Sequence, residues 1–191
     1  MKKLLFCLLV IILVIPKVNA QFTKIGGGTG FTTGYLFHEM DYDYNKSGHL
    51  FASLKSIYEI TVPIHISPSV TFFIPHVFKE LDTKTTVNTL MFDINGHYVF
   101  NSLDKFEFYG LAGLDIMLAW KREKYDTEVF KETDNAPGLN LGVGTYMKIT
   151  EQFDIYAEAK YILSKYDQFM LNAGVLINID WLKKHEDTGG L

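Results

Sequence analysis

Residues 106–121 read FEFYGLAGLDIMLAWK, and this stretch decides the fold. Every second residue from Phe106 to Trp120 is uncharged, and the residues between and after them hold all the charges. Because successive side chains of a β-strand point to opposite faces, the pattern predicts a strand with one apolar and one mixed face. A strand that crosses a bilayer needs about 9–11 residues, and this stretch is long enough, with aromatic residues at both ends.

The first 20 residues have the three parts of a secretory signal peptide. Lys2 and Lys3 give a positive start, an apolar run follows over residues 4–15, and Val18-Asn19-Ala20 is a small-residue cleavage pattern. The alternative is a retained anchor, but the apolar run is short for a spanning helix. Cleavage after Ala20 would remove the only cysteine and three lysines, changing the formal net charge from −4 to −7. This charge argues against a nucleic-acid partner.

The same alternation recurs along the chain, so the sequence predicts eight strands. Their expected ranges are 23–37, 56–66, 70–78, 87–100, 106–121, 138–149, 153–163 and 169–181. Ser67-Pro68-Ser69 is expected to turn the chain between the second and third strands, and Pro75 makes the third the least regular. Longer and shorter connections alternate, which is typical of outer-membrane barrels with an even strand number.

We therefore predict an all-β protein, an eight-stranded antiparallel up-and-down transmembrane β-barrel behind a cleavable signal peptide. The barrel would occupy residues 21–181, and a polar tail would occupy residues 182–191. Alternation alone also fits a soluble barrel that binds a hydrophobic ligand inside, with Phe92 and Leu114 pointing inward. The mixed face is rich in glycine, which suits the crowded interior of a small barrel better than an exposed sheet face. This composition favours the membrane interpretation.

The membrane interpretation predicts two aromatic girdles on the apolar face. One rim would carry Phe100, Phe106, Phe153 and Trp181, and the other would carry Tyr35, Phe37, Trp120, Tyr161 and Phe169.

The mixed face would place ten ionisable residues inside the barrel. They are Lys24, Glu59, His65, Asp93, His97, Glu107, Asp115, Lys148, Glu158 and Lys160. A catalytic or proton-conducting cluster is one interpretation of this set. An eight-stranded barrel is too narrow for an open channel, and buried charges are costly unless paired. We therefore favour a paired, hydrogen-bonded plug and predict no open diffusion pore.

The layout resembles the small eight-stranded outer-membrane β-barrel family, often labelled porin-like. It is also similar to the transmembrane domain of OmpA and to OmpX-type proteins. The most specific local match is the β-signal of the last strand, carried by Asn172, Gly174, Ile177 and Ile179. The resemblance implies a bacterial outer-membrane location and recognition by the barrel assembly machinery. Members usually end on an aromatic residue, whereas this chain continues past Trp181, so the signal would have to act internally.

No motif for a metal, a cofactor or catalysis stands out. Asp41, Asp43 and Asn45 begin like a calcium loop, but Lys46 and Ala52 occupy the positions of its glycine and glutamate. The glycines of residues 26–30 do not have phosphate-loop spacing. The six histidines are scattered, so a lipid-modifying enzyme is the less favoured alternative.

The remaining expectation is a structural or surface-interaction role in the outer membrane. External loops at residues 37–55, 79–86 and 122–136 would carry recognition, because loops on a rigid scaffold usually do. The residues to test first are Tyr42, Tyr44, Phe51, Tyr125 and Phe130. The barrel would contact the lipids of the outer membrane. A further candidate partner is lipopolysaccharide, whose phosphates could pair with Lys121, Arg122 and Lys124. The alternative for these three cations is a solvated, mixed-charge loop.

Overall fold

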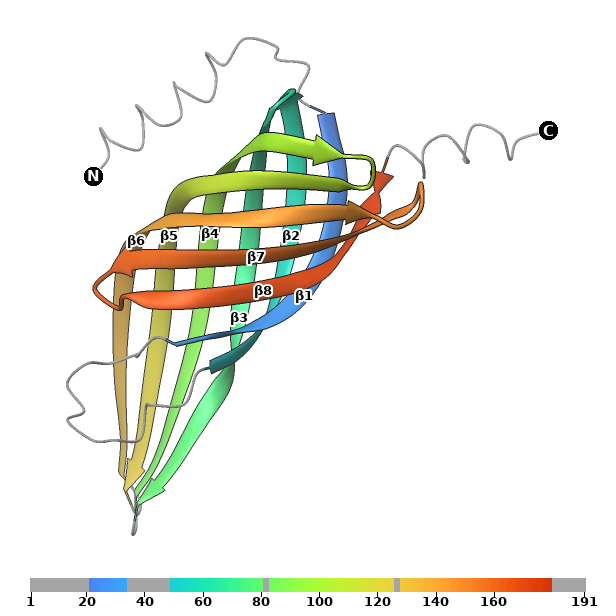
Figure 1. The fold of residues 1–191 in the computed structure, drawn as a ribbon. Helices are drawn as coiled ribbons and strands as arrows, with labels where there is room; N and C mark the ends of the chain where they lie inside the picture. The colour runs from blue at the N-terminus through green and yellow to red at the C-terminus, as the bar shows by residue number, and fades with distance from the viewer. Residues whose placement is uncertain (1–20, 34–48, 81–82, 126–127, 180–191) are drawn as a thin grey trace.

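The computed structural model describes residues 21–33, 49–80, 83–125 and 128–179. The strands are β1 (Gln21–Thr32), β2 (His49–Thr61), β3 (Ile64–Glu80), β4 (Thr83–Leu103), β5 (Phe106–Tyr125), β6 (Glu128–Lys148), β7 (Phe153–Ser164) and β8 (Gln168–Asn178). They form a closed barrel in sequence order, each antiparallel to its neighbours (Figure 1). The predicted eight-stranded up-and-down barrel is confirmed. The signal peptide and the polar tail lie outside the described residues and stay predictions.

The apolar face of each strand points away from the barrel interior. Leu114 is 64% exposed and Phe92 is 42% exposed, whereas Tyr109 and Met117 of the mixed face are buried. The alternative of a barrel with an apolar-lined ligand cavity required Phe92 and Leu114 inside, so it is wrong. Within the described ranges, no helix is long and apolar enough to cross a membrane.

The turn between β2 and β3 lies at Val62-Pro63, not at the predicted Ser67-Pro68-Ser69. Residues 67–69 continue β3, where Ser67 pairs with Asn95 and Ser69 with Asp93 of β4. The ladder to β2 is interrupted at Ser67 and Pro68, because proline has no N–H to donate. The ladder to β4 is intact there, so the strand continues through the proline.

Strands β3, β4, β5 and β6 extend well beyond the rest of the ring (Figure 1). β7 pairs with β6 only from Gly138 onward, and the β2–β3 ladder ends at Phe51 and Phe73. The predicted loops at 79–86 and 122–136 are therefore mostly strand, and residues 49–55 of the third predicted loop belong to β2. We call residues 75–80, 83–88, 120–125 and 128–136 the projecting sheet.

Two glycines allow β1 and β8 to close the ring. Gly28 lies directly opposite Gly174, and both face the interior. A Cβ built on Gly174 would lie 2.5 Å from the Cα of Gly28 and 2.7 Å from Cε1 of Tyr156. Real Cβ atoms do not approach so closely, so the buried Tyr156 ring packs where only glycine leaves room.

Gly174→Ala is expected to lower the free energy of unfolding by about 1–3 kcal/mol, the usual cost of overpacking. The new methyl group must push against the Gly28 backbone, which cannot rotate away. Urea titration of the folded protein in detergent micelles measures the change. Gly110→Ala is the matched control, because a Cβ there meets no atom within 4 Å. Equal stability of the two variants would contradict close packing at the β1–β8 seam.

Candidate functional site

The inward side chains of β5 line the barrel interior from one end to the other. Glu107 and Tyr109 lie at the end of the short turns, and Asp115 lies near the middle of the strand. Met117 and Ala119 follow toward the projecting sheet. The interior therefore changes from polar and aromatic, through charged, to apolar. We call these regions the vestibule, the charged layer and the mouth cluster.

Glu158 is the centre of the charged layer. Its carboxylate accepts hydrogen bonds from Lys55 Nζ and from Tyr109 Oη, the latter at 2.7 Å, and lies 3.7 Å from His97 Nε2. The Lys55 and Glu158 side chains are 1% and 3% exposed. Lys55 Nζ also lies 4.5 Å from the centre of the Tyr156 ring, a cation–π contact. Three strands, β2, β5 and β7, thus share one buried carboxylate.

A second buried ion pair lies farther along β7. Lys160 Nζ is 3.2 Å from Asp93 Oδ2, and Asn95 donates to the other oxygen of Asp93 at 2.6 Å. Asn140 in turn donates to Asn95 at 2.9 Å. Asp115 lies directly opposite Asp93, yet neither of its carboxylate oxygens has a hydrogen-bond partner in the described structure. The chain from Lys160 to Asn140 links β7, β4 and β6 across the lumen.

Aromatic rings fill the interior between the charged layer and the vestibule. Tyr109 stacks on His97 and on Tyr146, with ring centroids 4.4 Å apart in both pairs. His97 Nδ1 lies 2.6 Å from Tyr146 Oη. The vestibule is a polar pocket of about 200 Å³, where Lys24 pairs with Asp154 at 2.8 Å.

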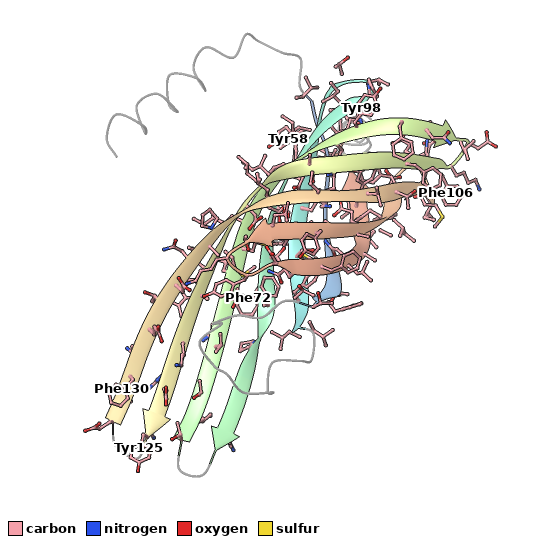
Figure 2. The ribbon with its side chains drawn as sticks, turned by 60° about the vertical axis from the view of Figure 1, so that its left-hand side comes forward. Tyr58, Phe72, Tyr98, Phe106, Tyr125 and Phe130 are labelled. Atoms are coloured by element: carbon pink, nitrogen blue, oxygen red, sulfur yellow. The ribbon has the colours of Figure 1, made fainter. Side chains whose placement is uncertain are left out.

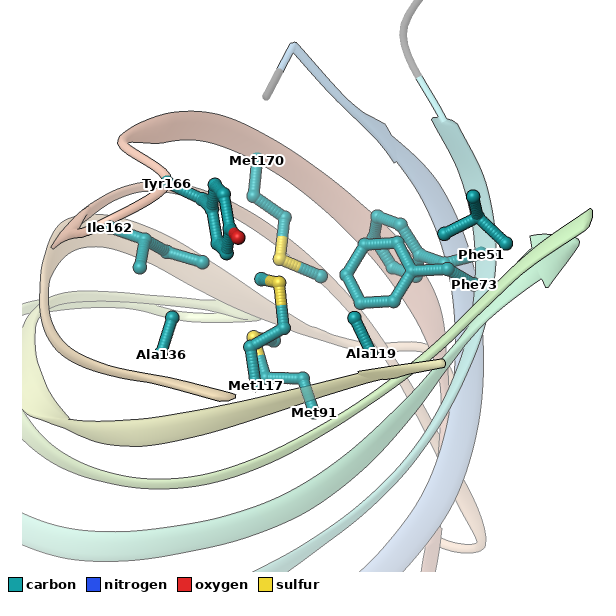
Figure 3. Packing of buried hydrophobic residues seen from close by; sticks show 10 residues of the cluster. Phe51, Phe73, Met91, Met117, Ala119, Ala136, Ile162, Tyr166 and Met170 are labelled. Atoms are coloured by element: carbon teal, nitrogen blue, oxygen red, sulfur yellow. The ribbon is translucent and has the colours of Figure 1, made fainter. Parts of the chain in front are cut away.

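The mouth cluster closes the other end of the lumen (Figure 3). Its buried members are Phe51, Phe73, Val87, Met91, Met117, Ala119, Ala136, Ile162, Tyr166 and Met170. Tyr166, from the β7–β8 turn, donates a hydrogen bond to Asp134 of β6. Lys165 Nζ contacts the same carboxylate at 2.6 Å. These bonds hold the turn over the lumen.

The structure brings together part of the predicted interior set. Asp93, His97, Glu158 and Lys160 belong to the charged layer, whereas Lys24, Glu107 and Lys148 line the vestibule. In the described structure, the other three lie beside these groups without joining their hydrogen bonds or ion pairs. The His65 ring is buried 6.4 Å from the Tyr146 ring, and Glu59 is half-buried beside His65 in the β2–β3 ladder. Asp115 lies opposite Asp93 but has no hydrogen-bond partner among the described residues.

Sequence reasoning missed several interior residues that make the strongest contacts. Lys55 fell in a predicted loop, although continuing the alternation of β2 backward from Ile57 would have placed it inside. Asp154 has the inward phase of β7 but was not in the predicted set. Tyr109, Tyr146 and Tyr156 carry the aromatic packing, and their phase was the only available signal.

The predicted rim residues that the structure describes all lie on the outer face. Phe100, Phe106 and Phe153 are exposed near the short-turn end, and Trp120, Tyr161 and Phe169 are exposed near the other end. Figure 2 shows Tyr58 and Tyr98 near the same end as the first group. Tyr35, Phe37 and Trp181 lie outside the described residues. Of the β-signal residues, Asn172 and Gly174 face inward, Ile177 faces outward, and Ile179 follows the end of β8.

The residues proposed for partner binding separate into different environments. Tyr125 and Phe130 are 55% and 58% exposed at the tip of the projecting sheet (Figure 2). Phe51 is 1% exposed and packs 5.7 Å from Phe73, so its prediction as a surface residue is wrong. The strand alternation turns its ring into the mouth cluster. Tyr42, Tyr44 and the calcium-like Asp41, Asp43 and Asn45 lie outside the described residues.

Comparison with solved structures supports the same architecture. Ail, the attachment invasion locus protein of Yersinia pestis, is 18% identical with a TM-score of 0.52, over 82% of this chain and 99% of Ail. The N-terminal β-barrel domain of Pseudomonas aeruginosa OprF is 14% identical with a TM-score of 0.55, over 83% and 98%. Neisserial surface protein A is 13% identical with a TM-score of 0.54, over 83% and 97%. At these identities the likeness concerns the fold.

The sequence itself identifies the family. No curated protein matches the chain. The family described as "Outer membrane protein beta-barrel domain" matches residues 5–181, which is most of the chain. The closed eight-stranded ring of this chain, with its polar network inside and its apolar face outside, agrees with that match. The chain therefore belongs to the outer membrane protein β-barrel domain family and is a protein of the bacterial outer membrane.

Proposed function

We propose that this protein is a closed, non-enzymatic outer-membrane barrel with a structural or surface-interaction role. The observation that carries the proposal is that four strands continue past a lumen filled by side chains. The end that carries the projecting sheet and the long β1–β2 connection (residues 33–48) faces the outside of the cell, because barrels of this kind have short periplasmic turns and longer extracellular segments. The partners are outer-membrane lipids, the barrel assembly machinery and a surface ligand.

The filled lumen argues against a diffusion pore. The charged layer is bridged from β2 to β7 by Lys55 and Glu158, and from β4 to β7 by Asp93 and Lys160. The mouth cluster adds a buried apolar layer. Moving any of these side chains would leave a buried charge unpaired or break close packing. The contacts therefore favour a plug that stabilises the barrel.

The non-enzymatic part of the proposal rests on the surroundings of the histidines. His65 and His97 are the two whose side chains the structure describes, and both are buried in the lumen. His97 contacts Tyr146 and lies near Glu158, which already binds Lys55. Catalysis at His97 would require substrate to displace these interior contacts.

The projecting sheet supports a surface role. Tyr125 and Phe130 are exposed at its tip, on the face that continues the barrel interior. Exposed aromatic residues are enriched among the energetic centres of protein interfaces. Ail, at 17% identity to this chain, has a crystal structure in complex with the heparin analogue sucrose octasulfate. We propose that the projecting sheet of this chain also engages an extracellular ligand.

Reconstituted in a planar bilayer, the protein is expected to give no steady, ohmic conductance, because the charged layer and the mouth cluster block the lumen. Single-channel current recording measures this directly. A general diffusion porin recorded under the same conditions shows that the bilayer detects channels. Long-lived openings from folded protein would contradict the plug.

Glu158→Gln is expected to lower the free energy of unfolding by about 3–5 kcal/mol, because the buried Lys55 would lose its counter-charge. Lys55→Met combined with Glu158→Gln should recover a large part of that loss, since no unpaired cation remains. Urea titration in detergent micelles measures both. Glu132→Gln is the matched control: it removes an exposed carboxylate 3.7 Å from Lys121, which keeps Glu123 at 3.5 Å, so the cost should be below about 1 kcal/mol. Equal losses for Glu158→Gln and Glu132→Gln would refute the plug's stabilising role.

Tyr125→Ser combined with Phe130→Ser is expected to abolish attachment of cells that display the protein to immobilised extracellular-matrix proteins, because aromatic anchors are energetic centres of protein interfaces. Removing both rings takes away the exposed apolar area at the tip. The readout is the number of bound cells relative to cells without the protein. Val129→Ser changes a residue of the opposite face and should leave attachment unchanged. Full attachment by the double variant, or none by the unmodified protein, would count against the surface role.

A further inference from the structure

The charges of the projecting sheet are sorted by face. Strand phase places its cations, apart from Lys121, on the face that continues the lipid-facing surface of the barrel. They are Lys79, Lys84, Arg122, Lys124 and Lys131, and all are exposed. No described acidic residue of the projecting sheet shares this phase. The acids Glu123, Glu128, Glu132 and Asp134 have the phase of the barrel interior. We call the first surface the cationic face.

Cross-strand pairing brings the cations together. Lys84 lies directly opposite Lys79 on one side and Lys124 on the other, and Arg122 lies opposite Lys131. Like charges directly opposite in a sheet are destabilising. In the described structure none of these five residues forms an ion pair, so no described side chain offsets their mutual repulsion.

Lys121 shows the contrast within the same segment. Its Nζ lies 3.5 Å from Glu123 and 3.7 Å from Glu132, on the acidic face. Of the three cations that the sequence presents together, Lys121 is therefore paired with acids, whereas Arg122 and Lys124 have no ion-pair partner among the described residues. The solvated, mixed-charge alternative describes Lys121 but does not describe the cationic face.

The cationic face begins just beyond the aromatic rim. Trp120 is exposed on the outer face of β5, and Arg122 and Lys124 follow in the same phase. At about 3.4 Å per residue and a tilt of roughly 40°, they rise about 5 Å and 10 Å above Trp120. The polar layer on each side of a bilayer is about 5–7 Å thick. The backbone of Arg122 and Lys131 thus falls within that layer, and the backbone of Lys124 and Lys84 lies about 3 Å beyond it.

From this arrangement we infer that the cationic face binds the phosphate groups of lipopolysaccharide in the surrounding outer leaflet. Guanidinium and ammonium groups form strong, charge-assisted hydrogen bonds with phosphate oxygens. The phosphates would supply the negative charge that the face lacks, and the acyl chains would lie against the apolar surface below Trp120. The inference rests on the proposed function for the outward direction of the projecting sheet.

Continuity with the lipid-facing surface favours a membrane lipid over a soluble polyanion. A sulfated polysaccharide would need only the charges, and it would find them equally well on a face away from the bilayer. Here the cations lie on the strand phase that faces lipid, and the acids lie on the other phase. A ligand embedded in the outer leaflet meets the first set without approaching the second.

The test replaces four cations in the variant Lys84→Gln/Arg122→Gln/Lys124→Gln/Lys131→Gln. Purified lipopolysaccharide is titrated into the folded protein in detergent micelles, and the dissociation constant is measured by thermophoresis. The variant should bind about tenfold or more weakly, because several exposed charge contacts are lost together. Added salt should weaken binding by the unmodified protein.

The control variant Lys105→Gln/Lys121→Gln/Lys148→Gln/Lys165→Gln removes the same amount of charge from residues that do not belong to the cationic face. It should bind lipopolysaccharide within about twofold of the unmodified protein, and the ion pairs that it breaks contribute little to stability. Dephosphorylated lipopolysaccharide should bind as weakly as the first variant does. Equal weakening by both variants, or unchanged binding by the first, would overturn the inference. So would tight binding of heparin with no binding of lipopolysaccharide.

Failure of the proposed function is recognised separately. A gel shift on boiling shows whether each variant is folded, and an epitope tag placed at residues 126–127 shows on intact cells whether the projecting sheet faces outward. A tag that is inaccessible on intact cells would refute the orientation. An accessible tag with unchanged lipopolysaccharide binding would refute only the role of the cationic face.

Discussion

The narrow interior of an eight-stranded ring is the constraint on which the rest of the structure depends. Such a ring has room for one filling of side chains, so inward residues are favoured when they are small, apolar or paired, and Asp115 is an exception among the described residues. Glycine takes the positions where a tyrosine ring covers the backbone, as at Gly174 under Tyr156. Glu158 satisfies Lys55 and Tyr109 at once. The plug is therefore a consequence of barrel size as much as of any functional demand.

The predictable part of the fold follows from a period of two. Alternation fixes which residues share a face, and glycine on the mixed face indicates which face is inside. This is enough to place Glu158 and Asp93 in the lumen but not to pair them, because pairing depends on register between strands distant in sequence. Lys55 and Glu158 are more than 100 residues apart, on strands that are not neighbours in the ring. No local pattern contains that contact.

The errors lie where a strand lacks the usual composition. Ser67-Pro68-Ser69 has the residues of a turn, but the intact β4 ladder carries the strand through it. Residues 79–86 and 122–136 have the charges of a loop, because their strands leave the hydrocarbon region of the membrane. Apolar and polar residues then no longer alternate, although successive side chains still point to opposite faces of the sheet. The residue at which the apolar–polar alternation ends in the sequence is therefore not the residue at which the strand ends in the structure.

Beyond the membrane the alternation persists as a separation of charge. Arg122 and Lys124 keep the phase of Trp120, whereas Glu123 keeps the phase of Met117. A sheet surrounded only by water gains little from such sorting, since mixing the signs on each face would relieve repulsion between neighbours. The two faces must therefore meet different surroundings. One face continues the surface that touches lipid, and the other continues the wall of a closed lumen. Within the bilayer these two environments favour apolar residues on one face and polar residues on the other, and above the bilayer they favour positive charge on the first face and negative charge on the second.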